Sequence, residues 1–174
     1  MKRGSITAGE LIAKLEADPE FQRKKAERDA QMAVTFERRK KDEAGLVAEL
    51  RAVGYEVDSV YDFVNTHEEY SDAIPILIRH LDLAHEPVIR GGIVRALTIR
   101  FGGADVEATL LRHFESEKDH DLRWVFANAL KTAMPFARRK NHPEIEAVFR
   151  RNTRTKKKGQ PDGTDNDRAA PGRV

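Results

Sequence analysis

The strongest constraint in this sequence is an internal repeat with an offset of 33 residues. At that offset, LIRHL (77–81) falls on LLRHF (110–114), and IRGGIVRAL (89–97) falls on LRWVFANAL (122–130). Both matches share one register without a gap, and Glu86 also falls on Asp119. Two separated matches in one register indicate a duplicated unit, and the spacing of the apolar residues predicts that each unit is a pair of helices.

Capping and turn residues set the expected bounds of these helices. We expect helices over 71–82, 86–101, 105–116 and 119–134, followed by one that opens at His142-Pro143-Glu144. Ser71, Asp105 and Asp119 stand at N-cap positions, and Gly102-Gly103 should end the second helix. No segment sustains the alternation of a β-strand. The expected fold class is therefore all-α.

The first 54 residues predict a helical N-terminal extension. Thr7 and Glu10 have the spacing of a capping box, and Asp18-Pro19 opens a long helix that should run to about Val53, before Gly54. From Gln22 to Glu43 this helix is very polar. It is either a solvated helix packed at one end or a partner-binding arm. A further short helix is expected over 57–64.

The second helices of the two units each have one apolar face. Ile89, Ile93 and Leu97 recur every four residues in the first unit, as do Leu122, Phe126 and Leu130 in the second. This spacing marks the side that should face the core. The opposite ridge carries Gly91, Arg95 and Thr98 in the first unit, and Trp124, Asn128 and Lys131 in the second.

The second helices resemble the HEAT repeat. They combine Pro or an acidic residue, an aliphatic-Arg pair and a later Ala-Leu: Pro87, Ile89, Arg90, Ala96 and Leu97, then Asp119, Leu122, Arg123, Ala129 and Leu130. The signatures of ankyrin and tetratricopeptide repeats are missing, although their periods are close to 33. The chain looks most like the short bacterial HEAT-like repeats related to the phycobilisome-lyase family. The resemblance covers residues 71–134 well, and 46–64 and 143–150 weakly.

This resemblance implies an α-α superhelix, a short HEAT-like solenoid, after the N-terminal extension. The repeat domain would span 55–151, with clear repeats at 71–102 and 104–135. Stacked hairpins bury a continuous core that one hairpin cannot form alone. The resemblance also implies that Arg90 and Arg123 pair with acidic turn residues, for which Asp82 and Glu115 are the candidates.

In HEAT-like arrays the second helices line the concave surface, so the resemblance makes the ridge on these helices the candidate partner-binding site. Its residues are Trp124, Asn128, Lys131, Arg95 and Thr98. Trp124 is the only tryptophan, and a large aromatic on a polar ridge is typical of a binding hot spot. The alternative is that Trp124 fills space left by Gly91 and Gly92.

The C-terminal segment is basic. Residues 138–158 hold nine Lys or Arg and two Glu, a charge of +7, which leaves about −5 for the rest of a chain whose formal net charge is +2. Arg138, Arg139, Lys140, Arg150 and Arg151 are therefore the candidate residues for an alternative role in nucleic-acid binding. Residues 152–174 have almost nothing apolar and are expected to be disordered.

Catalytic and metal signals are weak. The chain has no cysteine, which excludes thiolate zinc sites, and it lacks the usual phosphate loops and nucleophile elbows. His80 and His113, with His85 and His120 nearby, stand near the ends of first helices, where the helix dipole favours a cation. We expect that the protein binds neither a metal nor a cofactor and that it is not an enzyme.

The expected function is protein–protein interaction or scaffolding, with another protein as the partner. Charged residues make up 34% of the chain, above the average of about 25%, which fits long solvated helix faces. No apolar stretch approaches the roughly 20 residues of a membrane span, and a signal peptide is missing, so we expect a cytoplasmic protein.

Overall fold

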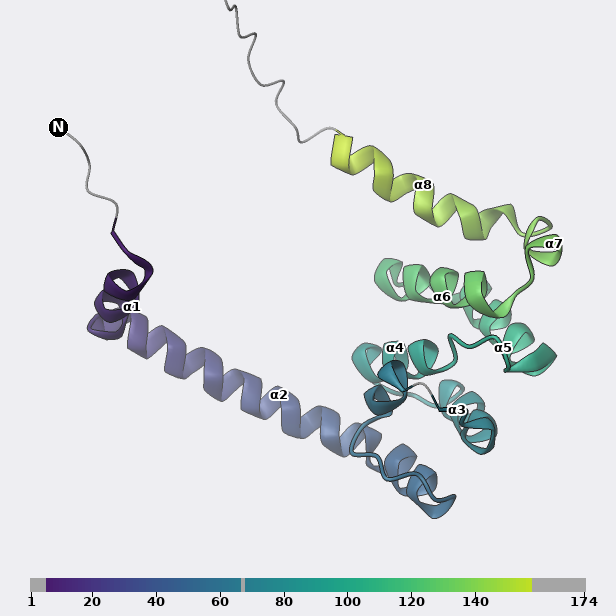
Figure 1. The fold of residues 1–174 in the computed structure, drawn as a ribbon, viewed down its shortest axis with the longest axis horizontal. Coiled ribbons are helices and arrows are strands. Elements are labelled where there is room, and N and C mark those ends of the chain that lie inside the picture. Colours follow the sequence, from purple (N-terminus) through teal and green to yellow (C-terminus); the bar gives the residue numbers. More distant parts are fainter. Residues whose placement is uncertain (1–5, 67, 158–174) are drawn as a thin grey trace, which may run out of the picture. The chain divides into compact units, whose positions relative to one another are not determined.

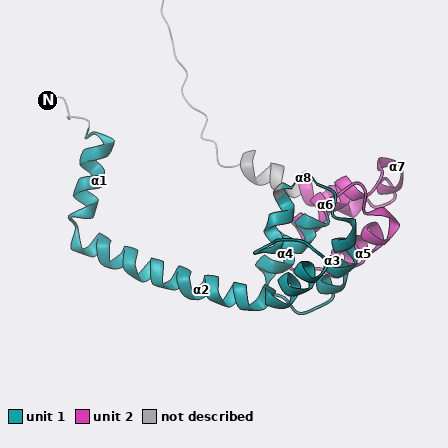
Figure 2. Ribbon diagram, turned by 60° about the horizontal axis from the view of Figure 1, so that its bottom comes forward, with its two compact units in different colours: residues 1–97 teal, residues 98–174 magenta. Residues whose placement is uncertain are grey.

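The computed structural model describes the backbone of residues 6–66 and 68–157, and the regular secondary structure of these residues is entirely helical (Figure 1). In chain order the elements are α1 (Ala8–Glu16), α2 (Pro19–Ala52), the 3₁₀ helices η1 (Val60–Asn65) and η2 (Ser71–Ala73), α3 (Ile74–Leu81), α4 (Pro87–Ala96), α5 (Gly103–Ser116), α6 (His120–Ala133), α7 (Phe136–Arg139) and α8 (Pro143–Lys157). The predicted all-α class is confirmed. The chain forms two compact units, Met1–Leu97 and Thr98–Val174 (Figure 2).

The N-terminal helices follow their capping signals. Thr7 and Glu10 form the predicted capping box, and the Asp18 carboxylate accepts the main-chain N–H of Glu20 at 2.9 Å at the start of α2. The 34 residues of α2 end before Gly54, whose φ of +98° suits a glycine terminator. Helix α2 is packed at one end only, because its buried residues all lie between Glu43 and Leu50.

In the first unit, the packed end of α2 meets α3, α4 and η1. Helix α4 approaches η1 closely at Gly92, where an added Cβ atom would lie 2.7 Å from Cγ1 of Val60. The Tyr61 hydroxyl donates to the carbonyl of Val88 at 2.9 Å. Only a residue without a side chain permits this approach, so Gly92 fixes how α4 packs on η1.

Helix α4 is shorter than predicted. It ends at Ala96 rather than near Phe101. The buried hydroxyl of Tyr70 donates to the Ala96 carbonyl at 2.6 Å, and this occupies an acceptor that a longer helix would use. In the second unit, residue 103 at the repeat offset is a glycine with no such hydroxyl, and α6 continues to Ala133.

Two predicted N-caps are wrong, and the predicted 57–64 helix is a 3₁₀ turn over 60–65. Tyr70 rather than Ser71 precedes η2, which leads into α3, and no side-chain cap is formed there. Helix α5 starts at Gly103, so Asp105 lies in its first turn. Gly103 has a φ of +71°, a left-handed conformation that suits glycine. It is the first residue of α5, whereas the sequence predicted that it would end the preceding helix.

In the second unit, α5 packs on α6, and α8 packs on the same helix. Asp119 caps α6 as predicted, accepting the N–H groups of Asp121 and Leu122 at 2.9 Å. Helix α8 runs to Lys157, so the prediction of disorder from residue 152 is wrong for its first six residues. No glycine or proline interrupts the sequence there before Gly159. Residues 158–174 lie outside the described residues.

The predicted apolar faces of the second helices are buried. Ile89, Ile93 and Leu97 are at most 2% exposed, and Phe126 and Leu130 are fully buried. Within the described ranges, none of the helices combines the length and the apolarity that crossing a membrane would require.

Candidate functional site

In the first unit a groove of about 650 Å³ runs along α2, and it is here named the α2 groove. One face of α2 from Phe36 to Arg51 forms one wall, and Tyr61 of η1 and Val88 and Ile89 of α4 form the other. Ala44, Val47 and Ala48 give the helix wall an apolar middle, and Phe36 stands 62% exposed at one end.

A cation without a partner lies in the α2 groove. The Nε atom of Arg39 is buried, and it has no hydrogen-bond partner among the described residues. The acidic side chains of the groove are already engaged: Glu43 accepts from Ser59, and Asp58 pairs with Arg51 at 2.6 Å. The groove is therefore apolar, with a half-buried arginine in its wall whose Nε atom lacks a hydrogen-bond partner among the described residues. A buried polar atom without a partner is energetically unfavourable.

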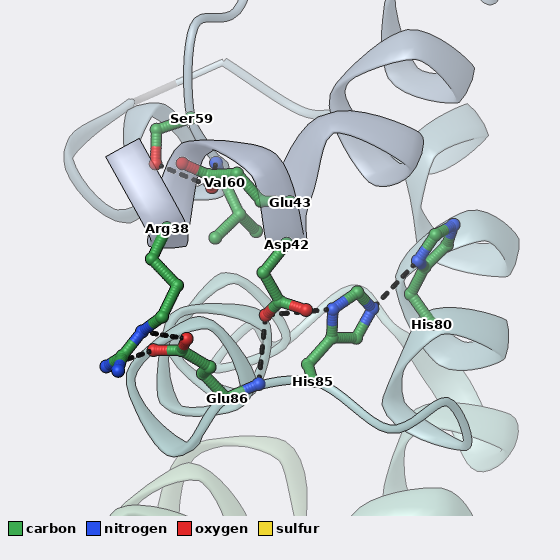
Figure 3. Close-up of polar contacts among 8 residues, drawn as sticks. All are labelled: Arg38, Asp42, Glu43, Ser59, Val60, His80, His85 and Glu86. Carbon is green, nitrogen blue, oxygen red and sulfur yellow. Dashed lines mark hydrogen bonds and ion pairs between the residues drawn. The ribbon is translucent and has the colours of Figure 1, made fainter. Parts of the chain in front are cut away.

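Polar contacts beside the groove fasten α2 to the elements under it (Figure 3). Glu43 is 7% exposed, and it accepts the Ser59 hydroxyl at 2.9 Å and the Val60 N–H at 3.2 Å, which caps η1. Arg38 pairs with Glu86 at 2.5 Å. These contacts hold the two walls of the groove in place.

A chain of four titratable side chains continues from this cluster, and Figure 3 draws three of them, Asp42, His85 and His80. Nδ1 of His80 and Nε2 of His85 are 3.0 Å apart. The other nitrogen of His85 lies 3.4 Å from the Asp42 carboxylate, and the other nitrogen of His80 lies 3.4 Å from the Glu49 carboxylate. Both imidazoles are at least nine-tenths buried. Burial lowers the pKa of His80, although the carboxylate of Glu49 acts in the opposite direction.

The predicted ridge on α6 is partly covered by α8. Trp124 is 40% exposed, and its ring meets that of Phe149 edge-on, with 6.4 Å between centroids. The Lys131 ammonium lies 4.1 Å from the centroid of the Phe149 ring, and the Asn128 amide donates to the carbonyl of Trp124. All three residues are thus brought together, but α8 shares the surface on which a partner would sit.

The first-unit half of the ridge is less regular. Arg95 is exposed on α4, whereas Thr98 is half-buried and follows the end of the helix. Space over Gly92 is filled by Val60 and Tyr61. Arg95 belongs to the unit Met1–Leu97, whereas Thr98 and the ridge residues of α6 belong to the unit Thr98–Val174.

The predicted basic site is largely neutralised within its own unit. Arg138 pairs with Glu107 at 2.9 Å, and Arg139 pairs with Glu146 at 3.1 Å. Arg139 also donates to the carbonyl of Lys131. Lys140 and Arg150 are exposed, and the side chain of Arg151 lies outside the described residues. Paired arginines attract phosphate less than free ones, so this arrangement weakens the case for nucleic acid.

Arg123 has other partners than the acidic turn residue that the resemblance implied. Arg123 donates to the main-chain carbonyls of Phe114 and Glu117 at 2.8 and 3.2 Å, and its guanidinium lies 4.2 Å from the centroid of the Phe114 ring. The predicted partner, Glu115, is exposed instead. The arginine therefore satisfies the carboxyl end of α5 rather than an acidic side chain.

Glu115 belongs to a cluster that the sequence did not indicate. Its carboxylate, His142 and Glu144 each offer one donor atom, and these atoms lie within 4.8 Å of one another. The His142 ring nitrogen is 3.2 Å from the Glu144 carboxylate. Glu115 is fully on the surface, where water competes for its oxygens, so the cluster is accounted for as a histidine–carboxylate ion pair with a neighbouring acid.

Sequence reasoning missed both the α2 groove and the histidine pair. The signal for the pair was present in α2, where Asp42 and Glu49 are seven residues apart and so share a face. A sequence pattern for the groove was also present, because one face of the helix carries four of its lining residues at helical spacing: Phe36, Lys40, Val47 and Arg51. Neither pattern identifies what the opposing wall contributes.

Comparison of the chain with protein-family models, with curated proteins and with solved structures finds no match.

Proposed function

We propose that this chain is a non-enzymatic protein-interaction module that takes an amphipathic helix of a partner protein into the α2 groove. The observation that carries the proposal is the buried, unpartnered Nε of Arg39 in an otherwise apolar groove. A partner helix with an aspartate or glutamate among its apolar residues would pair with the half-buried Arg39 and cover the apolar wall. Helix-in-groove recognition uses apolar anchors at i, i+3, i+4 and i+7.

The length of the groove supports a helix as its occupant. From Phe36 to Arg51 the wall follows α2, a distance of about 22 Å at 1.5 Å per residue. That length matches roughly four turns of a docked helix. The exposed, very polar half of α2 leads into the open end at Phe36.

Charge favours an acidic partner over a basic one. Arg39 has no acidic neighbour that satisfies its Nε, and exposed Lys40 adds a second cation beside it. Glu43 and Asp58 are held by Ser59 and Arg51, so they offer little to a basic ligand. An acidic side chain docked on Arg39 would form a charge-assisted hydrogen bond away from bulk water.

We also propose that the two helical pairs are HEAT-like. Both pairs pack internally, α3 with α4 and α5 with α6. The second helices begin at matching positions, Pro87 and His120, one repeat offset apart. The carbonyl contacts of Arg123 support a structural role for the arginine of the motif. Such modules commonly serve binding, which agrees with the proposed function.

Two matched peptides test the groove. Each is a fluorescein-labelled, 16-residue amphipathic helix of alanine and leucine, and the two differ only in a central Glu or Lys. We expect the Glu peptide to bind the full chain at least about fivefold more tightly in fluorescence anisotropy, an effect of about 1 kcal/mol. Arg39→Met should remove this preference, because Met keeps the apolar stem without the charge.

A pair of tryptophan variants controls for position on α2. Ala44→Trp fills the apolar middle of the groove and should abolish binding, whereas Ala30→Trp, on the exposed part of the same helix, should not. Equal binding by both variants overturns the groove assignment.

Octanoate serves as a small apolar carboxylate. If it perturbs the amide signals of the groove while neither peptide binds, the site is one for small molecules and the interaction proposal is wrong.

A further inference from the structure

The contact between His80 and His85 limits how many protons the two imidazoles can carry. Each neutral imidazole carries one N–H and one lone pair. The two facing nitrogens, 3.0 Å apart, need one proton between them. The two outer nitrogens are buried and form no hydrogen bond among the described residues. Nδ1 of His85 lies 3.4 Å from the Asp42 carboxylate and Nε2 of His80 lies 3.4 Å from the Glu49 carboxylate, and a carboxylate can only accept. Full satisfaction of the chain therefore takes three protons on four nitrogens.

A neutral pair holds only two of these protons. If His85 donates to His80, the outer nitrogen of His85 presents its lone pair to Asp42. If His80 donates instead, the lone pair of His80 faces Glu49. Either way a buried lone pair opposes a carboxylate, which is unfavourable in surroundings of low dielectric. One added proton removes the conflict, because each outer nitrogen then carries an N–H that can turn toward the carboxylate 3.4 Å away.

A second added proton cannot be accommodated. It would place an N–H on each of the facing nitrogens, and two donors 3.0 Å apart repel each other. The pair therefore has room for one positive charge and no more. Two separate histidines in an unfolded chain have no such limit.

The geometry suits a proton rather than a metal ion. The ring centroids are 5.3 Å apart and the facing nitrogens 3.0 Å apart. The centroid distance exceeds the nitrogen distance by about one ring diameter, which means that both nitrogens lie near the line between the two centroids. A transition metal needs about 2.0–2.1 Å to each nitrogen, which an in-line gap of this size does not provide. A hydrogen bond fits it directly.

We propose that His80 and His85 form a one-proton site, which takes up a single proton between Asp42 and Glu49 and latches the α3–α4 connection to α2. This set of contacts, here named the latch, includes a main-chain group as well as the two rings and the two carboxylates. Asp42 also accepts the main-chain N–H of Glu86 at 2.9 Å, so the residue that opens α4 is bonded to the same carboxylate. A second proton breaks the facing contact and loosens this connection.

The remaining charges around the pair come from each element that packs on it. Helix α2 contributes Asp42 and Glu49, and also Arg38, which holds Glu86. Helix α3 contributes Arg79, which pairs with Glu49. Because Arg79 shares Glu49, the carboxylate of Asp42 is the less neutralised of the two.

The latch joins the two elements, α2 and α4, that form walls of the α2 groove. This consequence rests on the proposed function, whereas the one-proton site does not. Loss of the latch in acid would release the α4 wall and weaken binding of the Glu peptide. The proton site itself is tested without any ligand.

The test is a pH titration of the full chain labelled with ¹⁵N-histidine, from pH 8 to pH 4.5, by long-range ¹H–¹⁵N correlation. We expect the four ring nitrogens of His80 and His85 to shift together in two steps, with one proton taken up in the first. The second step should fall below the titration of His80 in the urea-unfolded chain. In His85→Gln, His80 should titrate in one step.

Three outcomes decide the matter. Two independent single-step titrations that match the unfolded chain would overturn the one-proton site. A shift of both rings on addition of one equivalent of Zn²⁺ at pH 7.5 would also overturn it, in favour of a metal site. Coupled two-step behaviour supports it, and His80→Gln provides the reciprocal variant if His85→Gln does not fold. Failure of the peptide experiment would leave this result standing, so the two proposals fail separately.

Discussion

The Tyr70 hydroxyl donates to the Ala96 carbonyl at 2.6 Å, and this bond joins the residue before η2 to the last residue of α4. Both residues are buried, at 4% and 0% exposure. Burial also raises the pKa of Tyr70, so the hydroxyl stays a donor. One side chain thus ends the second helix of the first unit, and its repeat equivalent, Gly103, cannot do the same in the second.

Replacing Tyr70 with Phe should destabilise the chain by about 1–2 kcal/mol, because the buried Ala96 carbonyl loses its partner while the ring contacts remain. Urea denaturation followed by circular dichroism measures the change. An unaltered midpoint would show that water or a lengthened α4 replaces the hydroxyl, and the assignment of Tyr70 as the helix terminator would then be wrong.

Gly92→Ala should cost about 1–3 kcal/mol, because its Cβ atom would meet Val60 at 2.7 Å and Tyr61 at 2.9 Å. Gly45→Ala is the matched control on a helix. Nothing lies within 4 Å of the added Cβ atom there, so the better helix propensity of Ala should stabilise by up to about 1 kcal/mol. Thermal melting of both variants checks the opposite signs, and equal effects would contradict the close packing of α4 on η1.

Stability should fall on acidification through the histidine pair. The pKa of His80 is lower in the folded chain than the value of about 6.5 of an unfolded histidine, so the unfolded state binds more protons in mild acid. The first proton that the pair takes up stabilises the folded chain, so the loss belongs to the second proton, which the fold excludes from His80. The contribution from that exclusion is complete above the unfolded pKa and declines below it, by at most about 1.4 kcal/mol per pH unit. Urea midpoints of wild type and His80→Gln between pH 5 and pH 8 measure it. Parallel curves would contradict the assignment.

Trp124→Ala should destabilise the second unit by about 1–2 kcal/mol, less than the 3–5 kcal/mol typical of a fully buried aromatic. The indole is 40% exposed, and its ring contact is with Phe149 on α8. The melting midpoint and the affinity for the Glu peptide should be measured on the same variant. Since the proposed groove lies on α2, peptide binding should stay intact, and its loss without unfolding would return the partner site to the α6 ridge.

Local signals in the sequence determined much of this protein. The offset of 33 residues gave the start of the second helix in both units, at Pro87 and His120. Capping residues such as Asp18 and Asp119 placed helix starts, because a side chain two or three residues away satisfies their free N–H groups. The four-residue spacing identified the buried faces. These features depend on neighbours within one or two turns, so the sequence alone determines them.

Tertiary structure decided what depends on distant partners. The end of α4 was mispredicted because Tyr70, which is 26 residues before Ala96, supplies the bond that stops it. The α2 groove needs walls from α2, η1 and α4, and the pairing of His80 and His85 with Asp42 and Glu49 needs α2 to lie across the α3–α4 connection. A hydrogen bond or a groove wall exists only once packing brings its two sides together. Helical periodicity specifies the side that a residue faces, but the partner on that side is fixed by the fold.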